Sequence, residues 1–283
     1  MSTPLVALTV AGTDSGGAAG VAADLATFAD HGHHGALAVS ALTAQDTTAV
    51  RAVHVPPLAF LAAQVDAVLG DLPVAAVKTG MLGSPGAVRL VAERLAARPG
   101  RPLVVDPVLV ATSGAVLGDR DVAAAYRDLL PHASVVTPNL DEARALLGLD
   151  PSDATPPALL AADLADRGCA VVLTGGPAPG AAPDRCIDHV AVPGRPATRA
   201  VHPWVDTRND HGSGCTFAAA LAARLAGGPA RPGHHDPADL VAAVEDAASY
   251  TAARLERSRA WRLGAGRGPV AHTSAPTHPG GDR

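Results

Sequence analysis

Short apolar runs alternate with amphipathic stretches along almost the whole chain. Runs of Val, Ala and Leu bounded by Gly, Pro or Asp predict strands, and apolar residues spaced three and four apart predict helices. We predict strands over residues 5–10, 37–43, 75–77, 103–105, 135–136 and 170–173, and further strands within 187–203. We predict helices over residues 21–30, 57–69, 85–97, 122–130, 140–147, 157–167, 217–226 and 240–257.

Repeated alternation of strand and helix is typical of α/β proteins in which helices cover both faces of a mostly parallel sheet. No charge shift or long linker divides the sequence, so we expect a single domain over residues 1–272. Residues 273–283 are rich in Pro, Gly and Ser, and we expect them to form a disordered tail. Residues 227–237 predict a surface loop.

Polar side chains follow the predicted strands at the points where those strands end. Because ligands of open α/β sheets gather at the carboxyl ends of the strands, this shared position predicts a binding site, although each residue alone is compatible with an ordinary turn. The residues concerned are Asp14, Gln45, Lys78, Asp106, Asn139 and Thr174.

A second glycine-rich segment precedes the Ala-rich helix near residue 217. Gly212, Ser213 and Gly214 can direct consecutive backbone N–H groups to one point, which makes an anion site at a helix N-terminus. Cys215 follows at that positive end, where we expect the helix dipole to lower the pKa of the thiol. The alternative is that the glycines only form a turn and that Cys215 is a buried side chain without a chemical role.

Composition narrows the class of protein further. The 283 residues carry a net charge of −5, and the hydrophobic residues (48%) include few aromatics (2%), which suits layered helix–sheet packing. The arginines are scattered, so we expect no nucleic-acid binding. No apolar run is long enough to cross a bilayer, and we expect no membrane partner. The loop at 12–20 matches neither a dinucleotide fingerprint nor a P-loop.

Cysteine and histidine positions give no metal or disulfide pattern. Cys169, Cys186 and Cys215 are irregularly spaced, which fits neither a disulfide framework nor a zinc motif. The histidines within 31–34 lie in a Gly-rich bend, and we interpret them as solvated loop residues. The N-terminus has no charged region followed by an apolar stretch, so we expect no signal peptide and a cytoplasmic location.

Taken together, the motifs resemble those of the ribokinase-like superfamily of small-molecule kinases, and within it the hydroxymethylpyrimidine/phosphomethylpyrimidine kinases of thiamine biosynthesis. They occur in the order of that family from about residue 5 to 272. The resemblance rests on Ala11-Gly12-Thr13-Asp14, Ala23-Asp24-Leu25, Ala41-Leu42-Thr43-Ala44-Gln45, Lys78-Thr79-Gly80-Met81-Leu82, Asp106-Pro107-Val108, Thr137-Pro138-Asn139-Leu140, Asn209-x-His211-Gly212-Ser213-Gly214-Cys215-Thr216 and Gly264-x-Gly266-x-Gly268-Pro269-Val270.

The resemblance implies a homodimer that uses ATP and Mg²⁺. It implies phosphoryl transfer to the hydroxymethyl group of 4-amino-5-hydroxymethyl-2-methylpyrimidine and then to the resulting monophosphate. A pyridoxal kinase on the same scaffold is the alternative, since pyridoxal also carries a hydroxymethyl group beside a heteroaromatic ring. A pyrimidine-binding pseudokinase is a further alternative.

The resemblance also assigns roles to single residues. Cys215 stands where sugar kinases of the superfamily carry an Asp base, which implies that its thiolate accepts the hydroxymethyl proton while the amides of Gly212, Ser213 and Gly214 form the anion hole. The residues implied for the pyrimidine are Gly12, Asp24, Gln45, Met81 and Val108. Those implied for the nucleotide are Asn139, Thr174, Gly176, Thr207 and His211, and those for the metal are Asp106 and Glu142.

Two positions depart from the family pattern. The family usually has Lys where this chain has Thr112 and Thr174, and Lys78 is the only lysine of the chain. If those lysines contact phosphate, their absence predicts weak ATP binding or an impaired second phosphorylation. The alternative is that Mg²⁺ and the helix dipole suffice.

Overall fold

The computed structural model describes residues 3–110, 117–176, 184–228 and 235–273. Thr112, the centre of the predicted loop at 227–237 and all but the first residue of the predicted tail lie outside the described residues. Among the helices of the described ranges, none is long and apolar enough to cross a membrane.

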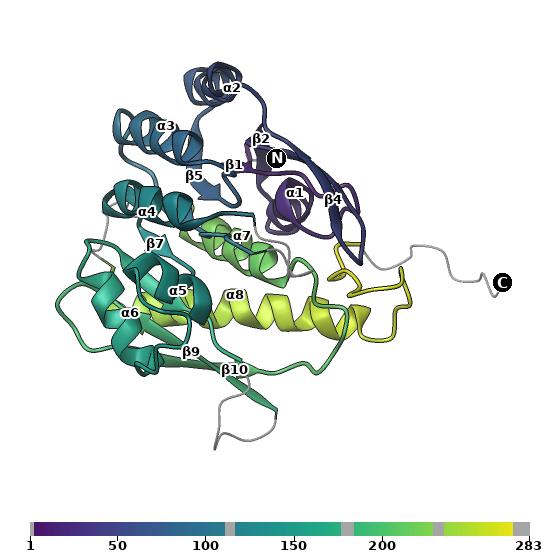
Figure 1. Ribbon diagram of the computed structural model, residues 1–283, viewed down its shortest axis with the longest axis vertical. Helices are drawn as coiled ribbons and strands as arrows, with labels where there is room; N and C mark the ends of the chain where they lie inside the picture. The colour runs from purple at the N-terminus through teal and green to yellow at the C-terminus, as the bar shows by residue number, and fades with distance from the viewer. Residues whose placement is uncertain (1–2, 111–116, 177–183, 229–234, 274–283) are drawn as a thin grey trace.

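A mostly parallel sheet forms the centre of the fold (Figure 1). Its eight strands follow the order β10-β9-β8-β7-β6-β5-β1-β2, in which β9 alone runs against the others. The strands are β1 (Val6–Ala11), β2 (His34–Val39), β5 (Val74–Thr79), β6 (Leu103–Val105), β7 (Val135–Val136), β8 (Ala170–Leu173), β9 (Arg185–Ala191) and β10 (Thr198–Pro203).

Helices cover both faces of the sheet, as predicted (Figure 1). Of the helices in the described ranges, five lie on one face and three lie on the opposite face. The first group consists of α2 (Leu58–Asp71), α3 (Pro85–Ala96), α4 (Arg120–Leu129), α5 (Leu140–Leu147) and α6 (Pro157–Ala165). The second group consists of α1 (Gly20–Asp30), α7 (Ser213–Leu225) and α8 (Pro237–Ser258).

Alternating strand residues supply the two apolar cores. Leu8 and Val105 pack toward α2–α6, whereas Ala7 and Val104 pack toward α1, α7 and α8. This follows from the two-residue period of a strand, which sends neighbouring side chains to opposite faces. The buried residues of α7 are mostly Ala, and such small side chains allow a helix to pack closely against its neighbours.

One predicted strand proves to be two. The residues predicted as a strand at 37–43 belong partly to β2 and partly to β3 (Leu42–Gln45), which pairs with β4 (Val50–His54) in a separate antiparallel sheet. The chain leaves the main sheet at Ser40, whose hydroxyl donates to the carbonyl of Met81, 2.6 Å away. The structure therefore corrects the prediction, and the two-stranded unit β3–β4 carries Gln45 toward the ends of the main strands.

A buried ion pair joins α1 to the middle of the sheet. Lys78 on β5 and Asp24 on α1 are both fully buried, and Lys78 Nζ donates to the two Asp24 carboxylate oxygens at 2.9 and 3.0 Å. Thr9 Oγ1 donates to the same carboxylate at 2.6 Å, and Asp106 Oδ2 lies 3.6 Å from Lys78 Nζ. Although burial lowers it, the pKa of Lys78 is raised overall, mainly by Asp24 and also by Cys215 and Asp106. The ammonium group is therefore charged.

Removing the cation of this pair should strongly destabilise the fold. We expect Lys78→Met to lower the free energy of unfolding by about 3–5 kcal/mol, because the Asp24 carboxylate is left buried without its partner. The double variant Lys78→Met/Asp24→Asn should regain part of that loss. Denaturant unfolding measures both.

The matched control is Arg89→Met, which breaks an exposed ion pair between Arg89 and Asp128. We expect this change to cost no more than ~1 kcal/mol. If Lys78→Met costs no more than Arg89→Met, the buried pair does not hold the fold as described.

Candidate active site

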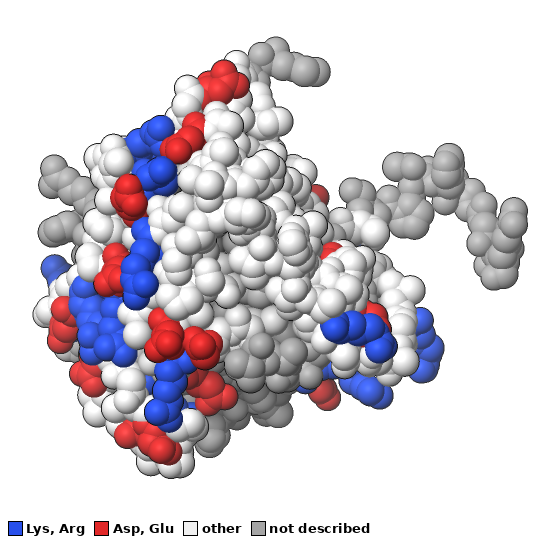
Figure 2. All heavy atoms as spheres, turned by 45° about the horizontal axis from the view of Figure 1, so that its top comes forward, with Lys and Arg blue, Asp and Glu red and all other residues white. Residues whose placement is uncertain are grey.

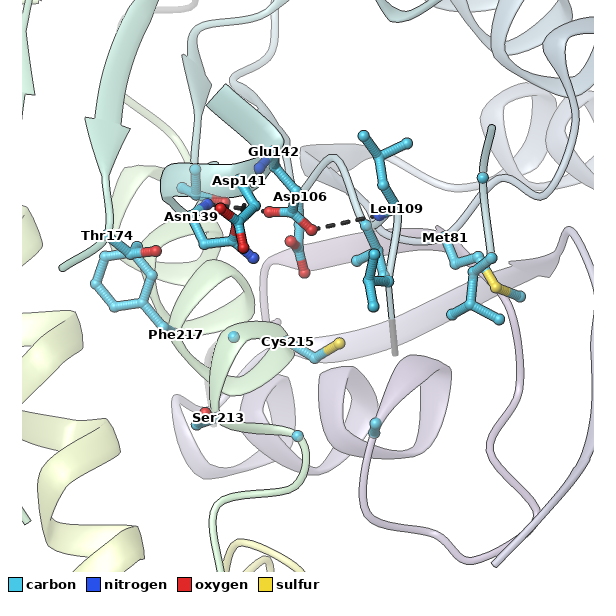
Figure 3. A pocket seen from close by; sticks show the side chains of 18 of the residues that line it. Met81, Asp106, Leu109, Asn139, Asp141, Glu142, Thr174, Ser213, Cys215 and Phe217 are labelled. Atoms are coloured by element: carbon cyan, nitrogen blue, oxygen red, sulfur yellow. Dashed lines mark hydrogen bonds between the residues drawn. The ribbon is translucent and has the colours of Figure 1, made fainter. Parts of the chain in front are cut away.

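A large cavity lies at the carboxyl ends of the parallel strands. Its volume is about 1160 Å³, and its lining comes from the segments that follow β1, β5, β6, β7 and β8, from β3, and from the first turn of α7 (Figure 3). Five of the six polar residues predicted from the strand ends line it: Asp14, Gln45, Asp106, Asn139 and Thr174. Lys78, the sixth, is fully buried beneath them.

One part of the cavity wall is apolar and adaptable. The backbone N–H of Gly12 donates to the carbonyl of Met81 at 3.1 Å, and a Cβ at position 12 would lie 2.4 Å from the Met81 methyl group. A side chain at position 12 would therefore displace the Met81 methyl group from this part of the cavity. Val108 and Gln45 also line the cavity. The structure thus brings four of the five residues predicted for a pyrimidine to one cavity.

Asp24 is the exception and corrects the prediction that it contacts a ligand. Its side chain is fully buried, lies outside the cavity lining and is bonded to Thr9 and Lys78. Both oxygens are already engaged by the lysine. Asp24 therefore supports the floor of the site.

Asp14 organises the loop that leads into α1. Its carboxylate accepts the backbone N–H groups of Gly16, Ala18 and Ala19 at 2.8–3.0 Å. Its Oδ2 also lies 3.0 Å from His211 Nε2. Although burial raises it, the hydrogen bonds from His211 and the backbone lower the pKa of Asp14 below its usual value. Asp14 therefore stays ionised and links the loop after β1 to the loop before α7.

His211 lies between Asp14 and Gln45. Its Nε2 is 3.0 Å from Gln45 Nε2, so the ring contacts a residue that the sequence assigned to the pyrimidine. The resemblance assigned His211 itself to the nucleotide. In the structure its ring contacts Asp14 and Gln45, and the assignment to the nucleotide stays a prediction.

The N-terminus of α7 begins directly at the glycine loop. Gly212 has φ +91°, and a Cβ there would lie 1.9 Å from the carbonyl of Ala18, so only glycine fits. The helix begins at Ser213, four residues earlier than predicted, which places Gly214 and Cys215 in its first turn. The first-turn amides of a helix have no partner within the helix and point toward its N-terminal side.

These amides are not all available to a ligand. The N–H of Ser213 donates to the carbonyl of Asp210, which corrects the prediction that Ser213 belongs to the anion hole. Within the described residues, the amides of Gly212, Gly214 and Cys215 have no hydrogen-bond acceptor. The structure therefore leaves three N–H groups for an anion, and one of them belongs to Cys215.

The thiol of Cys215 points into the cavity near the carboxylate of Asp106 (Figure 3). Burial raises the pKa of Cys215 to about 12, and the carboxylates of Asp106 and Asp24 act in the same direction while Lys78 opposes them. This corrects the expectation of a lowered pKa. Desolvation and two neighbouring anions outweigh the buried lysine, so the thiol is protonated in this structure.

Two carboxylates lie opposite the thiol. Glu142 accepts the N–H of Asn139 at 3.0 Å and that of Leu109 at 3.3 Å, while Asn139 accepts the N–H of Glu142 at 2.9 Å. This reciprocal pair caps α5 and fixes both side chains. Burial and the charge of Asp106 raise the pKa of Glu142 to about 8.

The same carboxylates fit a magnesium ion. Asp106 Oδ2 is buried and accepts no hydrogen bond among the described residues, although it lies 3.6 Å from Lys78 Nζ. A buried carboxylate oxygen without a donor calls for a cation, and oxygen ligands with retained waters suit Mg²⁺. Asp106, Glu142 and the nearby amide of Asn139 are therefore the residues that would hold it.

The remaining residues predicted for the nucleotide are scattered. Thr174 lines the cavity, but its hydroxyl donates to the carbonyl of Pro138 at 3.2 Å. Gly176 and Thr207 do not line it, although Gly175, directly before Gly176, and Val205, two residues before Thr207, do. Thr207 instead caps its own loop by accepting the N–H of Asn209. The structure thus supports Thr174 as a lining residue and leaves Gly176 and Thr207 outside the lining.

Cationic residues that the sequence did not single out border the cavity. They are Arg120 and Arg127 on α4 and Arg144 on α5. Their positions resemble those of ordinary solvent-facing arginines on amphipathic helices, so no sequence signal separates them. In the fold they add positive charge at the border of a cavity that is lined by several carboxylates.

A C-terminal segment completes the site from the outside. Gly268 accepts the N–H of His211 and donates to the carbonyl of Arg208, while Val270 donates to the carbonyl of His211. Arg267 donates to the carbonyl of Thr47, in the turn between β3 and β4. The segment at 264–270 therefore ties the loop before α7 to the β3–β4 unit.

Comparison with known proteins identifies the family. A family model described as phosphomethylpyrimidine kinase matches residues 14–271. The chain is 42% identical over 271 residues to the hydroxymethylpyrimidine/phosphomethylpyrimidine kinase of Rhizobium meliloti, covering 94% of this chain and 96% of that one. It is 37% identical to the Bacillus subtilis protein of the same name, covering 94% of each. It spans 34% of the thiamine biosynthesis multifunctional protein ThiED of Corynebacterium efficiens, at 39% identity.

Solved structures agree with this result. Pyridoxal kinase from Staphylococcus aureus in complex with pyridoxal superposes with a TM-score of 0.79 at 31% identity, covering 96% of this chain and 94% of that one. Phosphomethylpyrimidine kinase from Clostridium difficile gives a TM-score of 0.68 at 28% identity, covering 85% and 96%. The predicted ribokinase-like α/β architecture is confirmed. The chain belongs to the phosphomethylpyrimidine kinase family.

Proposed function

We propose that this protein phosphorylates 4-amino-5-hydroxymethyl-2-methylpyrimidine and then its monophosphate, with ATP as the phosphoryl donor. Relatives named for this activity match 94% of the chain. The observation that carries the proposal is the single cavity itself. It joins the wall of Gly12, Gln45 and Met81 to the first turn of α7 and the carboxylates of Asp106 and Glu142.

The pyrimidine would lie against the apolar wall of the cavity. Met81 and Val108 offer an adaptable apolar surface for a flat ring. The Gln45 amide has both a donor and an acceptor, which match the amino group and ring nitrogen of an aminopyrimidine. Because His211 contacts the same amide, it would hold Gln45 in the orientation that the ring requires.

The hydroxymethyl group would then face Cys215. We assign the thiolate of Cys215, formed when the thiol releases its proton to solvent as the substrates bind, as the group that accepts the hydroxyl proton while the oxygen attacks the γ-phosphoryl group. Because the pKa of Cys215 is about 12 in this structure, this role requires the pKa to fall when the substrates bind. Lys78 already acts in that direction, and loss of free negative charge at Asp106 would add to it.

Phosphate charge would be met by the protein at two places. The amides of Gly214 and Cys215 point toward the N-terminal side of α7, where they can donate to the oxygens of the transferring group. Mg²⁺ held by Asp106 and Glu142 would neutralise phosphate charge when bound. Asp106 and Glu142 themselves are fixed by Lys78 and by the cap of α5.

Pyridoxal is the second candidate substrate. The likeness to a pyridoxal kinase solved with pyridoxal, at 31% identity over 96% of this chain, favours testing it. The apolar wall described above would accept either ring. Cytoplasmic location and the absence of nucleic-acid and membrane partners stay predictions.

The assignment is tested by ATP consumption with Mg²⁺ and with hydroxymethylpyrimidine, its monophosphate and pyridoxal supplied separately. We expect turnover with both pyrimidines. Cys215→Ala should lower kcat by about 10²- to 10⁴-fold, as expected for loss of a proton acceptor, while calorimetry still shows pyrimidine binding. Turnover on pyridoxal alone would identify the second candidate instead.

The control is Cys169→Ala, which removes a buried thiol outside the cavity and should retain turnover. Pyrimidine binding by the unaltered protein without any turnover would identify a pseudokinase. Undiminished kcat in Cys215→Ala would exclude the thiol as the proton acceptor.

The Thr174 position offers a separate test of nucleotide binding. We expect Thr174→Lys to lower the KM for ATP about three- to tenfold, since a charge-assisted phosphate contact replaces a hydroxyl that bonds only to Pro138. Thr198→Lys adds the same charge on exposed β10, away from the cavity, and should leave the KM unchanged. Equal effects of the two variants would show that net charge, rather than a local contact, governs the KM.

We infer that the protein forms a homodimer through the β3–β4 unit and the start of α2. Large apolar side chains are exposed there, and Figure 2 shows a broad face free of charged residues. The exposed residues are Leu42, Val53, Val55, Leu58 and Phe60, with exposures of 41–61%.

Sedimentation equilibrium tests this interface. We expect a dimer for the unaltered protein and a shift toward monomer in Phe60→Asp, because a carboxylate would be buried against apolar residues. Leu159→Asp is the matched control, since Leu159 is 56% exposed on α6, and it should leave the dimer intact. A monomeric unaltered protein, or an intact Phe60→Asp dimer, would exclude this interface.

A further inference from the structure

A cysteine, an aspartate and a histidine meet on the inner face of β9 and β10. Cys186 pairs directly with His202 across the two antiparallel strands, and Asp188 lies two residues further along β9 on the same face. One sulfur, oxygen or nitrogen donor from each side chain lies within 4.8 Å of the others. In the described ranges, this is the one group of three such side chains that comes so close.

Contacts with the backbone position two of these side chains, Asp188 and His202. Asp188 Oδ1 accepts the N–H of Gly175 at 2.8 Å, which leaves Oδ2 directed toward His202 Nε2, 3.1 Å away. His202 Nδ1 lies 3.2 Å from the carbonyl of Pro203. In this structure His202 Nε2 is paired with the Asp188 carboxylate. A bound ion would replace the ring proton at Nε2, while Nδ1 kept its contact with the backbone carbonyl, which is the usual arrangement behind a metal-bound imidazole.

Burial and access both suit a bound ion. Cys186 is 3% exposed, and the side chains of Asp188 and His202 are 4% and 15% exposed. All three nevertheless line the large cavity, so an ion can reach them from the open space. A thiolate and a carboxylate together match the charge of a divalent cation.

We propose that Cys186, Asp188 and His202 bind one Zn²⁺ ion through three protein ligands, with the fourth position open to the cavity. Tetrahedral coordination at about 2.0–2.3 Å places donor atoms roughly 3.3–3.8 Å apart. The Asp188–His202 separation of 3.1 Å is close to that range, and the outer limit of 4.8 Å requires only a small side-chain movement.

This site differs in chemistry from the one at Asp106 and Glu142. Sulfur and imidazole donors select Zn²⁺ and similar transition metals, whereas Mg²⁺ prefers oxygen ligands and retained waters. Gly175, which orients Asp188, follows directly after Thr174 in the cavity wall. The ion would therefore lie on the same wall as Thr174.

Co²⁺ provides a direct probe, because a thiolate bound to Co²⁺ gives a near-ultraviolet charge-transfer absorption and tetrahedral Co²⁺ absorbs strongly in the visible. After chelator treatment, the full chain should bind one Co²⁺ with both absorptions, and Zn²⁺ should displace it. Excess Mg²⁺ should not. Cys186→Ser should abolish the charge-transfer band, and His202→Gln should weaken binding at least tenfold.

Two matched controls separate this site from other thiols and histidines. His189→Gln alters a histidine on the opposite face of β9, and Cys215→Ala removes the other thiol that lines the cavity. Both should keep the band. Melting curves without metal verify that each variant is folded, and Asp188→Asn offers an independent ligand removal. Absence of the band in the unaltered protein, its persistence in Cys186→Ser or its loss in Cys215→Ala would overturn the proposal.

Discussion

The buried ammonium group of Lys78 is the constraint around which this site is built. A cation without water requires anions within reach, and Asp24 supplies one by presenting both carboxylate oxygens from α1. That demand fixes α1 against β5 directly beneath the cavity. The two acids therefore differ in role, since both oxygens of Asp24 bind Lys78, whereas one oxygen of Asp106 accepts no hydrogen bond from the part of the chain that the structure describes. The charges of Lys78, Asp24 and Asp106 thus serve both the stability of the fold and the candidate site.

The spacing of apolar residues predicted most of the strands and helices. A strand that is buried on both faces gives a short continuous apolar run, whereas a helix that is buried on one face has apolar residues three and four positions apart. The prediction failed where long-range hydrogen bonds decide the chain path. The run at 37–43 is continuously apolar, but Ser40 bonds to Met81 and turns the chain out of the sheet. The start of α7 was predicted late because the glycines suggested a loop, whereas Gly212 alone makes the turn and helix geometry begins at Ser213.

The position of the candidate site was predictable from strand ends, but the state of its residues was not. Nothing in the sequence indicates that Lys78 will bind both carboxylate oxygens of Asp24. The pKa of Cys215 depends on desolvation and on neighbouring carboxylates, neither of which a helix N-terminus reveals. Cys186 and His202 are far apart in sequence and meet only through the register of β9 and β10. Spacing rules for metal sites describe short loops and do not detect such a pair.

The segment at 264–270 affects the order in which parts of the protein can fold during synthesis. Its bonds to His211, Arg208 and Thr47 hold the loop before α7 against the β3–β4 unit. On a ribosome, therefore, the sheet can assemble while residues 264–270 are still inside the exit tunnel, and until they emerge the loop before α7 is held by its other contacts, such as those of His211 with Asp14 and Gln45. Synthesis thus separates the time at which the scaffold folds from the later time at which this last connection forms.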